Sequence, residues 1–290
     1  MGGTESCRRA PGSTLSPPSR VWWKDGMSIE VLTGVLLPSL GFASLTVALL
    51  LWPGRRPGVE PFPSGARRGA ALVLLSLFLA LVCWAPVFQF PEVDPGVVAG
   101  GGNFGALFVG HALLVLFLAL WWLLAGRPSP ASYLRVRWDA PGASLRLGIG
   151  GGVMGWALTL AAMATVGLFF SSDTASEDGA GVAIPATVEW LVSLPWYQRL
   201  AVALSAGIFE EAFFRSFLQV RAGLLLSSAL FTASHMSYGL PLMLVGIFTF
   251  SVFLGLLFRV RNDVVPCMIA HAVFDAIQLF LILPLAVARG

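Results

Sequence analysis

Charged residues are scarce in this sequence, and lysine is almost missing from it. Asp, Glu, Lys and Arg make up 11% of the 290 residues, and Lys24 is the only lysine. Soluble domains carry roughly 25% charged residues, so this composition argues against a soluble globular protein. The net charge of +3 is too small for a basic surface that binds nucleic acid, and no nucleic-acid partner is expected.

Cysteine and histidine are also rare, which narrows the possible chemistry. The cysteines show no paired metal spacing, so the sequence predicts neither a disulfide framework nor a structural zinc site. They are Cys7, Cys83 and Cys267. The only histidines are His111, His235 and His271.

Hydrophobic residues are abundant instead: they make up 57% of the chain, and the mean hydropathy is +0.81. A short apolar run at 223–238 is counted as a span because Gly223 breaks the helix before it and a turn follows it. We expect an all-α, polytopic helical membrane protein with about eight transmembrane helices, or about seven as the alternative. The other apolar runs cover residues 29–52, 70–90, 104–125, 145–170, 199–220, 240–258 and 264–286.

Arginine placement predicts the orientation of these spans. Arginines gather in the loops after the first, third, fifth and seventh predicted spans, whereas the other loops are acidic or neutral. The positive-inside rule places the arginine loops in the cytoplasm and both termini outside. Basic residues in the polar tail at 1–27 disagree with this orientation. We expect Met27 to be the true start, or the tail to be disordered and without function.

A glycine-rich stretch at 148–155 contains a nucleotide-like pattern. No strand precedes it, and it lies inside a predicted span, so nucleotide binding is not expected. The pairs Gly148/Gly152 and Gly151/Gly155 have the small-xxx-small spacing that lets membrane helices pack closely. We therefore expect helix packing here.

Two adjacent glutamates lie within the apolar run at 199–220. A charge near the bilayer centre costs roughly 2.5–3.5 kcal/mol on insertion scales, so such a residue usually has a function. Glu211 precedes Arg215 by four residues, which predicts an intrahelical ion pair. Glu210 lies about 100° further around the helix and has no such partner, which makes it the candidate general base. The alternative is that both acids pair with arginines as purely structural groups.

Two further pairs with helical spacing follow. Phe231 and His235 share one helix face, and so do His271 and Asp275. Polar groups inside membrane proteins normally face inward and pair, so we expect these side chains and the glutamates to converge in one water-filled pocket. His111 has no polar neighbour at helical spacing and is expected to bridge helices through a hydrogen bond.

Together, these motifs resemble those of the CPBP family of intramembrane proteases, which includes the CAAX prenyl endopeptidases and bacteriocin-immunity relatives. The motifs are Glu210-Glu211-x-x-x-Arg215, Phe231-x-x-x-His235 and His271-x-x-x-Asp275. The resemblance covers residues 195–286. It implies a catalytic transmembrane core at 191–290, preceded by transmembrane helices and an outer loop at 28–190.

The resemblance also implies a role for each site residue. Glu210 corresponds to the base that activates water, and His235 to its partner. His271 corresponds to the group that stabilises the oxyanion of the tetrahedral intermediate. The residues that correspond to structural support of the site are Glu211, Arg215 and Phe231.

Asp275 departs from the eukaryotic prenyl proteases, which carry asparagine at this position. An ionised aspartate cannot donate a hydrogen bond to an oxyanion, so we expect Asp275 to orient His271 instead. The change also leaves open a zinc site with a position for water. Its ligands would be His235, His271, Asp275 and Glu210. Because the sequence has no His-Glu-x-x-His motif, catalysis by glutamate without a metal or cofactor is expected.

The sequence thus predicts an intramembrane endopeptidase of a bacterial cell membrane that acts on a membrane-associated peptide or protein. Two other classes stay open: a non-enzymatic scaffold or bacteriocin-immunity-type protein, and a proton-coupled transporter, since intramembrane acids and histidines also build proton relays. Transporters commonly have repeated halves, whereas these groups gather in the last third of the chain.

Overall fold

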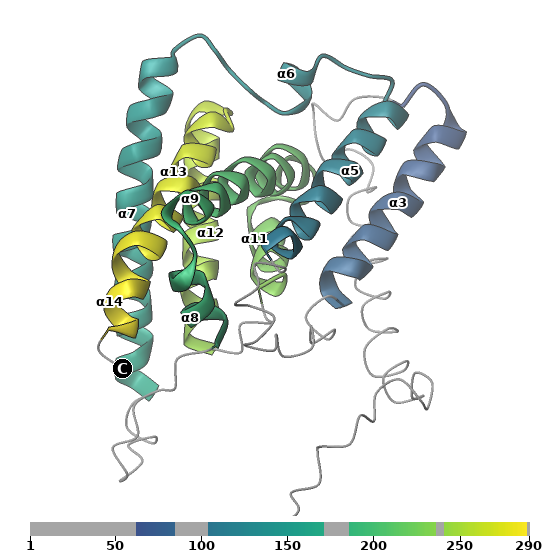
Figure 1. Ribbon diagram of the computed structural model, residues 1–290. Helices are drawn as coiled ribbons and strands as arrows, with labels where there is room; N and C mark the ends of the chain where they lie inside the picture. Colours follow the sequence, from purple (N-terminus) through teal and green to yellow (C-terminus); the bar gives the residue numbers. More distant parts are fainter. Residues whose placement is uncertain (1–61, 85–103, 171–185, 236–240, 289–290) are drawn as a thin grey trace, which may run out of the picture.

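The computed structural model describes residues 62–84, 104–170, 186–235 and 241–288 (Figure 1). Every regular element in this part of the chain is helical, which confirms the all-α prediction. The predicted tail at 1–27, Met27 and the predicted span at 29–52 lie outside the described residues.

The described elements follow one another along the chain as helices. They are α3 (Gly65–Trp84), η2 (Phe104–Phe108), α5 (Val109–Leu124), α6 (Pro130–Tyr133), α7 (Pro141–Phe170), α8 (Ala186–Ser193), α9 (Trp196–Ser205), η3 (Ala206–Glu210), η4 (Ala212–Gln219), α10 (Val220–Ala222), α11 (Leu224–Ala233), α12 (Pro241–Arg261), α13 (Val265–Ile277), η6 (Gln278–Ile282) and α14 (Leu283–Val287). Gly223, with φ +87°, separates α10 from α11. The predicted break at this glycine is therefore confirmed.

Four of the described helical stretches are long and apolar enough to cross a membrane, at residues 65–82, 141–169, 242–261 and 265–287. The described parts of α5 and α11 are apolar but shorter. The helix over 196–222 is not among the four, and it carries both glutamates together with several arginines. These helices agree with an integral membrane protein, while the total of eight spans stays a prediction.

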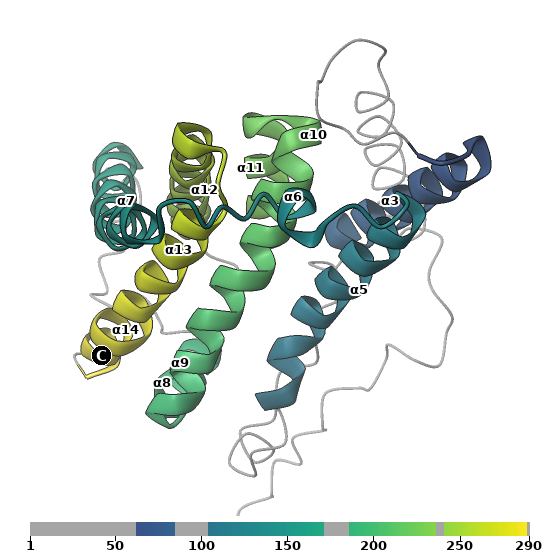
Figure 2. The ribbon, with the colours of Figure 1, turned by 90° about the horizontal axis from the view of Figure 1, so that it is seen from above.

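The helices lie side by side, with α7 at one edge of the molecule and α3 at the other (Figure 2). Helix α7 contacts α12 and α13, and α3 contacts α5. Between these two groups runs the continuous helix from α9 to α10, which touches α13 on one side and α5 on the other through η3. The two glutamates therefore lie in the middle of the assembly.

An aromatic cluster fixes α5 against this central helix. The ring of Phe117 in α5 lies 5.4 Å from that of Phe213 and 5.1 Å from that of Phe217, both edge-on. Trp121, one turn further along α5, meets Phe217 at 4.8 Å. All four side chains are buried. Edge-to-face rings add about 0.5–1.5 kcal/mol per pair beyond burial, so this contact sets the position of α5.

The glycines of α7 form the close contact with α13 that their spacing predicts. A Cβ atom on Gly152 would lie 2.6 Å from Val273 Cβ and 2.7 Å from the carbonyl oxygen of Ala270. A Cβ atom on Gly148 would lie 2.5 Å from Ile269 Cβ. Side chains larger than hydrogen are excluded at these positions, so α13 rests directly on the backbone of α7.

We expect Gly152→Ala to lower the free energy of unfolding by about 1–3 kcal/mol, the usual cost of overpacking. Gly150→Ala is the matched control on the same helix, because a Cβ atom there meets nothing within 4 Å. Thermal unfolding of both variants in detergent would measure the difference. Equal midpoints for the two variants would contradict the close contact between α7 and α13.

The start of α13 is held by one buried carboxylate in the connection after α12. Asp263 accepts hydrogen bonds from Ser144 Oγ at 2.8 Å, from the Val265 backbone N–H at 3.1 Å and from the Arg137 backbone N–H at 3.2 Å. The Val265 contact satisfies a donor in the first turn of the helix. Asp263 therefore ties α13 to α7 and to the loop before it.

Candidate active site

The central helix changes its winding where the glutamates occur. It is α-helical to Ser205, and π-helical over Ala206–Glu210 and Ala212–Gln219. The α-helix assumed from the sequence is therefore wrong over these turns. Here the helix presses against α13: a Cβ atom on Gly207 would lie 2.6 Å from the Met268 carbonyl oxygen. π-Helical turns are rare and occur frequently at functional sites.

Glu211 and Arg215 form the ion pair that their spacing predicts. Arg215 Nε donates to Glu211 Oε2 at 2.8 Å, and both side chains are fully buried. The guanidinium also donates from Nη2 to Ser251 Oγ at 3.0 Å and lies 5.3 Å from the centre of the Phe231 ring. A buried charge is tolerated only when it is paired and hydrogen-bonded. Arg215 meets both conditions through Nε and Nη2, while its buried Nη1 has no hydrogen-bond partner among the described residues.

The second oxygen of Glu211 binds a histidine on another helix. His271 Nδ1 in α13 donates to Glu211 Oε1 at 2.9 Å. On the other side of the ring, Asp275 Oδ2 lies 3.6 Å from Nε2, an ion-pair distance that is too long for a hydrogen bond. His271 thus lies between two carboxylates. Sequence spacing identified the Asp275 neighbour, but the Glu211 contact joins two different helices and has no spacing signal.

Glu210 makes its hydrogen bond to a different helix. Its Oε1 lies 3.3 Å from His111 Nε2 in α5, while Oε2 is buried and accepts no hydrogen bond from the described residues. The carboxylate also interacts electrostatically with His235 and His271. The adjacent glutamates therefore have different partners. Glu210 contacts His111 through one oxygen, and its other oxygen accepts no hydrogen bond from the described residues. Glu211 accepts hydrogen bonds at both oxygens, from Arg215 and His271.

His111 is the residue of this site that sequence reasoning did not place there. It was expected to bridge helices, and it does so by joining α5 to the central helix through Glu210. The sequence signal that could have placed it there is an ionisable residue inside an apolar helix, which is rare and usually functional. Its partner could not be identified, because the two residues are 99 positions apart.

His235 lies in the turn that follows the end of α11 at Ala233. Its Nδ1 is 2.7 Å from the Phe231 carbonyl oxygen and 3.1 Å from Ser234 Oγ. We assign the proton to Nδ1, since a carbonyl can only accept. In the neutral ring this assignment makes Nε2 an acceptor, which suits a nitrogen that positions water.

Phe231 packs between the two histidines. The centre of its ring lies 4.7 Å from that of His235 and 5.9 Å from that of His271. Phe250 of α12 closes the other side of His271, at 5.5 Å and edge-on. These rings surround the polar groups with apolar surface, which strengthens every electrostatic interaction among them.

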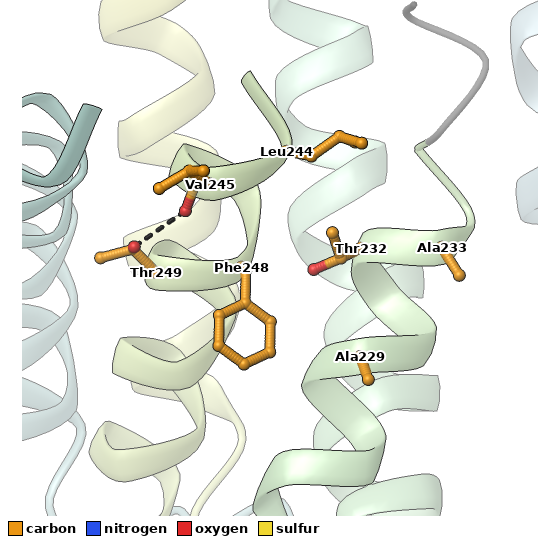
Figure 3. A pocket seen from close by; sticks show the side chains of 7 residues that line it. All are labelled: Ala229, Thr232, Ala233, Leu244, Val245, Phe248 and Thr249. Atoms are coloured by element: carbon orange, nitrogen blue, oxygen red, sulfur yellow. Dashed lines mark hydrogen bonds between the residues drawn. The ribbon is translucent and has the colours of Figure 1, made fainter. Parts of the chain in front are cut away.

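A pocket of about 480 Å³ opens between α11 and α12 and is almost wholly apolar (Figure 3). The hydroxyls of Thr249 and Thr232 donate to backbone carbonyls of their own helices, at 2.8 and 2.9 Å. None of the seven lining residues is titratable. By helical spacing, Phe231 lies on the opposite face of α11 from Ala229 and Ala233. The charged groups of the site are absent from the lining, so the pocket is not where they meet.

A catalytic zinc ion is held by three protein ligands. Within the described ranges, no three side chains of the His, Cys, Asp or Glu types are arranged so that they could hold one. The described residues therefore show no site for the zinc ion considered from the sequence, and catalysis without a metal stays a prediction.

Comparison with known proteins gives a match over the part of the chain that contains the two glutamates. A family model described as type II CAAX prenyl endopeptidase Rce1-like matches residues 192–277. No curated protein and no solved structure gives a significant match. The matched stretch contains both glutamates and runs from the end of α8 to the end of α13, whereas His111 lies outside it. Residues 192–277 thus form an Rce1-like segment, which confirms over this stretch the resemblance to the CPBP family indicated by the sequence motifs.

Proposed function

We propose that this protein is an integral membrane endopeptidase that hydrolyses a peptide bond of a membrane-associated peptide or protein. The observation that carries the proposal is the state of Glu210, whose Oε2 is buried and accepts no hydrogen bond from the described residues. Two histidines of the Rce1-like segment lie within electrostatic range of this carboxylate. A buried carboxylate with an uncommitted oxygen is suited to take a proton from water.

In the proposed reaction, water donates one hydrogen bond to Glu210 Oε2 and is held on its other side by His235 Nε2. Glu210 takes the proton, and the hydroxide oxygen forms a bond to the scissile carbonyl carbon. The carbonyl π electrons move onto its oxygen, which becomes the oxyanion. When the C–N bond breaks, the proton on Glu210 passes to the leaving nitrogen.

His271 is the proposed donor to the oxyanion. Its Nδ1–H is committed to Glu211 at 2.9 Å, which fixes the plane of the ring. We propose that the two flanking carboxylates keep the ring as an imidazolium, so that Nε2 also carries a proton. Among the described residues Nε2 has the longer contact to Asp275 at 3.6 Å, so its N–H can turn to donate a hydrogen bond to a substrate oxygen. Asp275 orients the ring as an acceptor and does not itself touch the oxyanion. Removing one such donor typically costs about 10²–10³ in kcat.

We also propose about eight transmembrane helices, with the arginine loops in the cytoplasm. The arginines before α7 and after α12 lie at the same end: the Val264 N–H donates to the Arg135 carbonyl at 3.0 Å, and Arg137 Nη1 to the Arg261 carbonyl at 3.2 Å. In Figure 1, this end is at the top, around α6 and the start of α7. Labelling a cysteine introduced at Arg259 from each side of the membrane would test this orientation.

The proposal is tested by comparing membrane peptidomes of cells that express the native protein and cells that express Glu210→Gln. We expect peptides that occur only with the native protein, and we expect a purified sample to cut the same substrates in the presence of a metal chelator. Identical peptidomes would point to a scaffold or a transporter instead. Loss of cleavage on chelation, restored by zinc, would show that a metal takes part.

A further inference from the structure

His111 is the one histidine of the site that the Rce1-like segment does not supply. It lies in the first turn of α5, and its Nε2 is 3.3 Å from Glu210 Oε1. Two aromatic rings pack beside it: the ring centres of Phe209 and Phe108 lie at 5.8 and 6.1 Å. The contact to Glu210 is the hydrogen bond that orients the ring.

The direction of this hydrogen bond follows from its two atoms. A carboxylate can only accept, so His111 Nε2 carries the proton. His111 Nδ1 is buried and has no hydrogen-bond partner among the described residues. A proton on Nδ1 would therefore be a buried donor without an acceptor, which is costly. The neutral ring with its proton on Nε2 satisfies the geometry.

We propose that His111 is a positioning residue for Glu210: it holds Oε1 and thereby leaves Oε2 as the oxygen that takes the proton from water. This inference rests on the proposed function. Without the donor, the carboxylate can rotate, and both oxygens compete for the same water. A catalytic group displaced by about 1 Å loses on the order of 10²-fold in rate, so one orienting hydrogen bond is sufficient to matter.

The test uses two substitutions of His111 in the full-length protein, with a purified substrate peptide. His111→Phe keeps an aromatic ring among the neighbouring rings but removes the donor, and we expect kcat to fall about 10- to 100-fold with KM unchanged. His111→Gln places an amide N–H near the position of Nε2, and we expect it to restore most of kcat. Phe108→Leu, which changes only the ring packing, is the control and should keep native kcat.

Native kcat in His111→Phe would overturn the inference, and so would equal losses in His111→Phe and His111→Gln. A fall in kcat for Phe108→Leu as large as that for His111→Phe would assign the effect to packing and also overturn it. These outcomes are distinct from failure of the proposed function, which would appear as undiminished cleavage by Glu210→Gln. Thermal unfolding of each variant verifies that the compared proteins are folded.

Discussion

Glu210→Gln is expected to lower kcat by about 10²–10⁴-fold, the usual contribution of a general base, while the protein stays folded. Glutamine has the shape of glutamate, and its amide oxygen can still accept the hydrogen bond from His111 Nε2. It cannot take a proton from water. Cleavage of a purified substrate, measured at several enzyme concentrations, would give the change in kcat.

Glu189→Gln is the matched control for this substitution. Glu189 lies on α8 and is exposed, so the same loss of one negative charge should leave kcat unchanged. Thermal unfolding of Glu210→Gln should stay close to that of the native protein, because no buried ion pair is broken. Undiminished proteolysis by a folded Glu210→Gln variant would falsify the proposed mechanism.

Arg215→Met is expected to lower the free energy of unfolding by about 3–5 kcal/mol, the usual cost of breaking a buried ion pair. Methionine fills much of the same space but leaves the Glu211 carboxylate without its strongest partner. The exposed fraction of both side chains in the native protein is 0%, so water cannot replace the lost hydrogen bond. Denaturant unfolding in detergent would measure the change.

Two comparisons separate the buried pair from a general effect of removing arginine. Arg146→Met removes an exposed arginine from α7 and should change stability little. The Glu211→Gln/Arg215→Met double variant should recover part of the lost free energy of unfolding. In this variant a neutral amide replaces the carboxylate that Arg215→Met alone leaves without its arginine. An Arg215→Met variant as stable as Arg146→Met would contradict a structural role for this ion pair.

Much of the fold was predictable because apolar runs and glycine spacing reflect local rules. The predicted span at 145–170 corresponds to α7, which begins at Pro141 and ends at Phe170. The helix break at Gly223 could be predicted because glycine adopts such a positive φ without strain. The π-helical turns around Glu210 were not predictable, since an apolar run tolerates either winding and the contact with α13 at Gly207 involves a distant part of the chain.

Some contacts of the site could likewise be predicted from the sequence, and others could not. The ion pair between Glu211 and Arg215 follows from a spacing of four residues on one helix. The hydrogen bond between Glu211 and His271 joins residues 60 positions apart, and that between Glu210 and His111 joins residues 99 positions apart. Helical spacing relates only neighbours on the same helix, so these two contacts required the packing of α5 and α13 against the central helix.

The glycine face of α7 has a consequence for any attempt to transplant this site. Helix α13 carries His271 and Asp275, yet its backing surface is formed by Gly148 and Gly152, which lie outside the Rce1-like segment. A chimera that grafts residues 192–277 into another set of membrane helices would carry over the glutamates but would bury α13 against side chains where it now meets backbone. Such a graft should succeed only with a host helix that presents small residues at the same two positions.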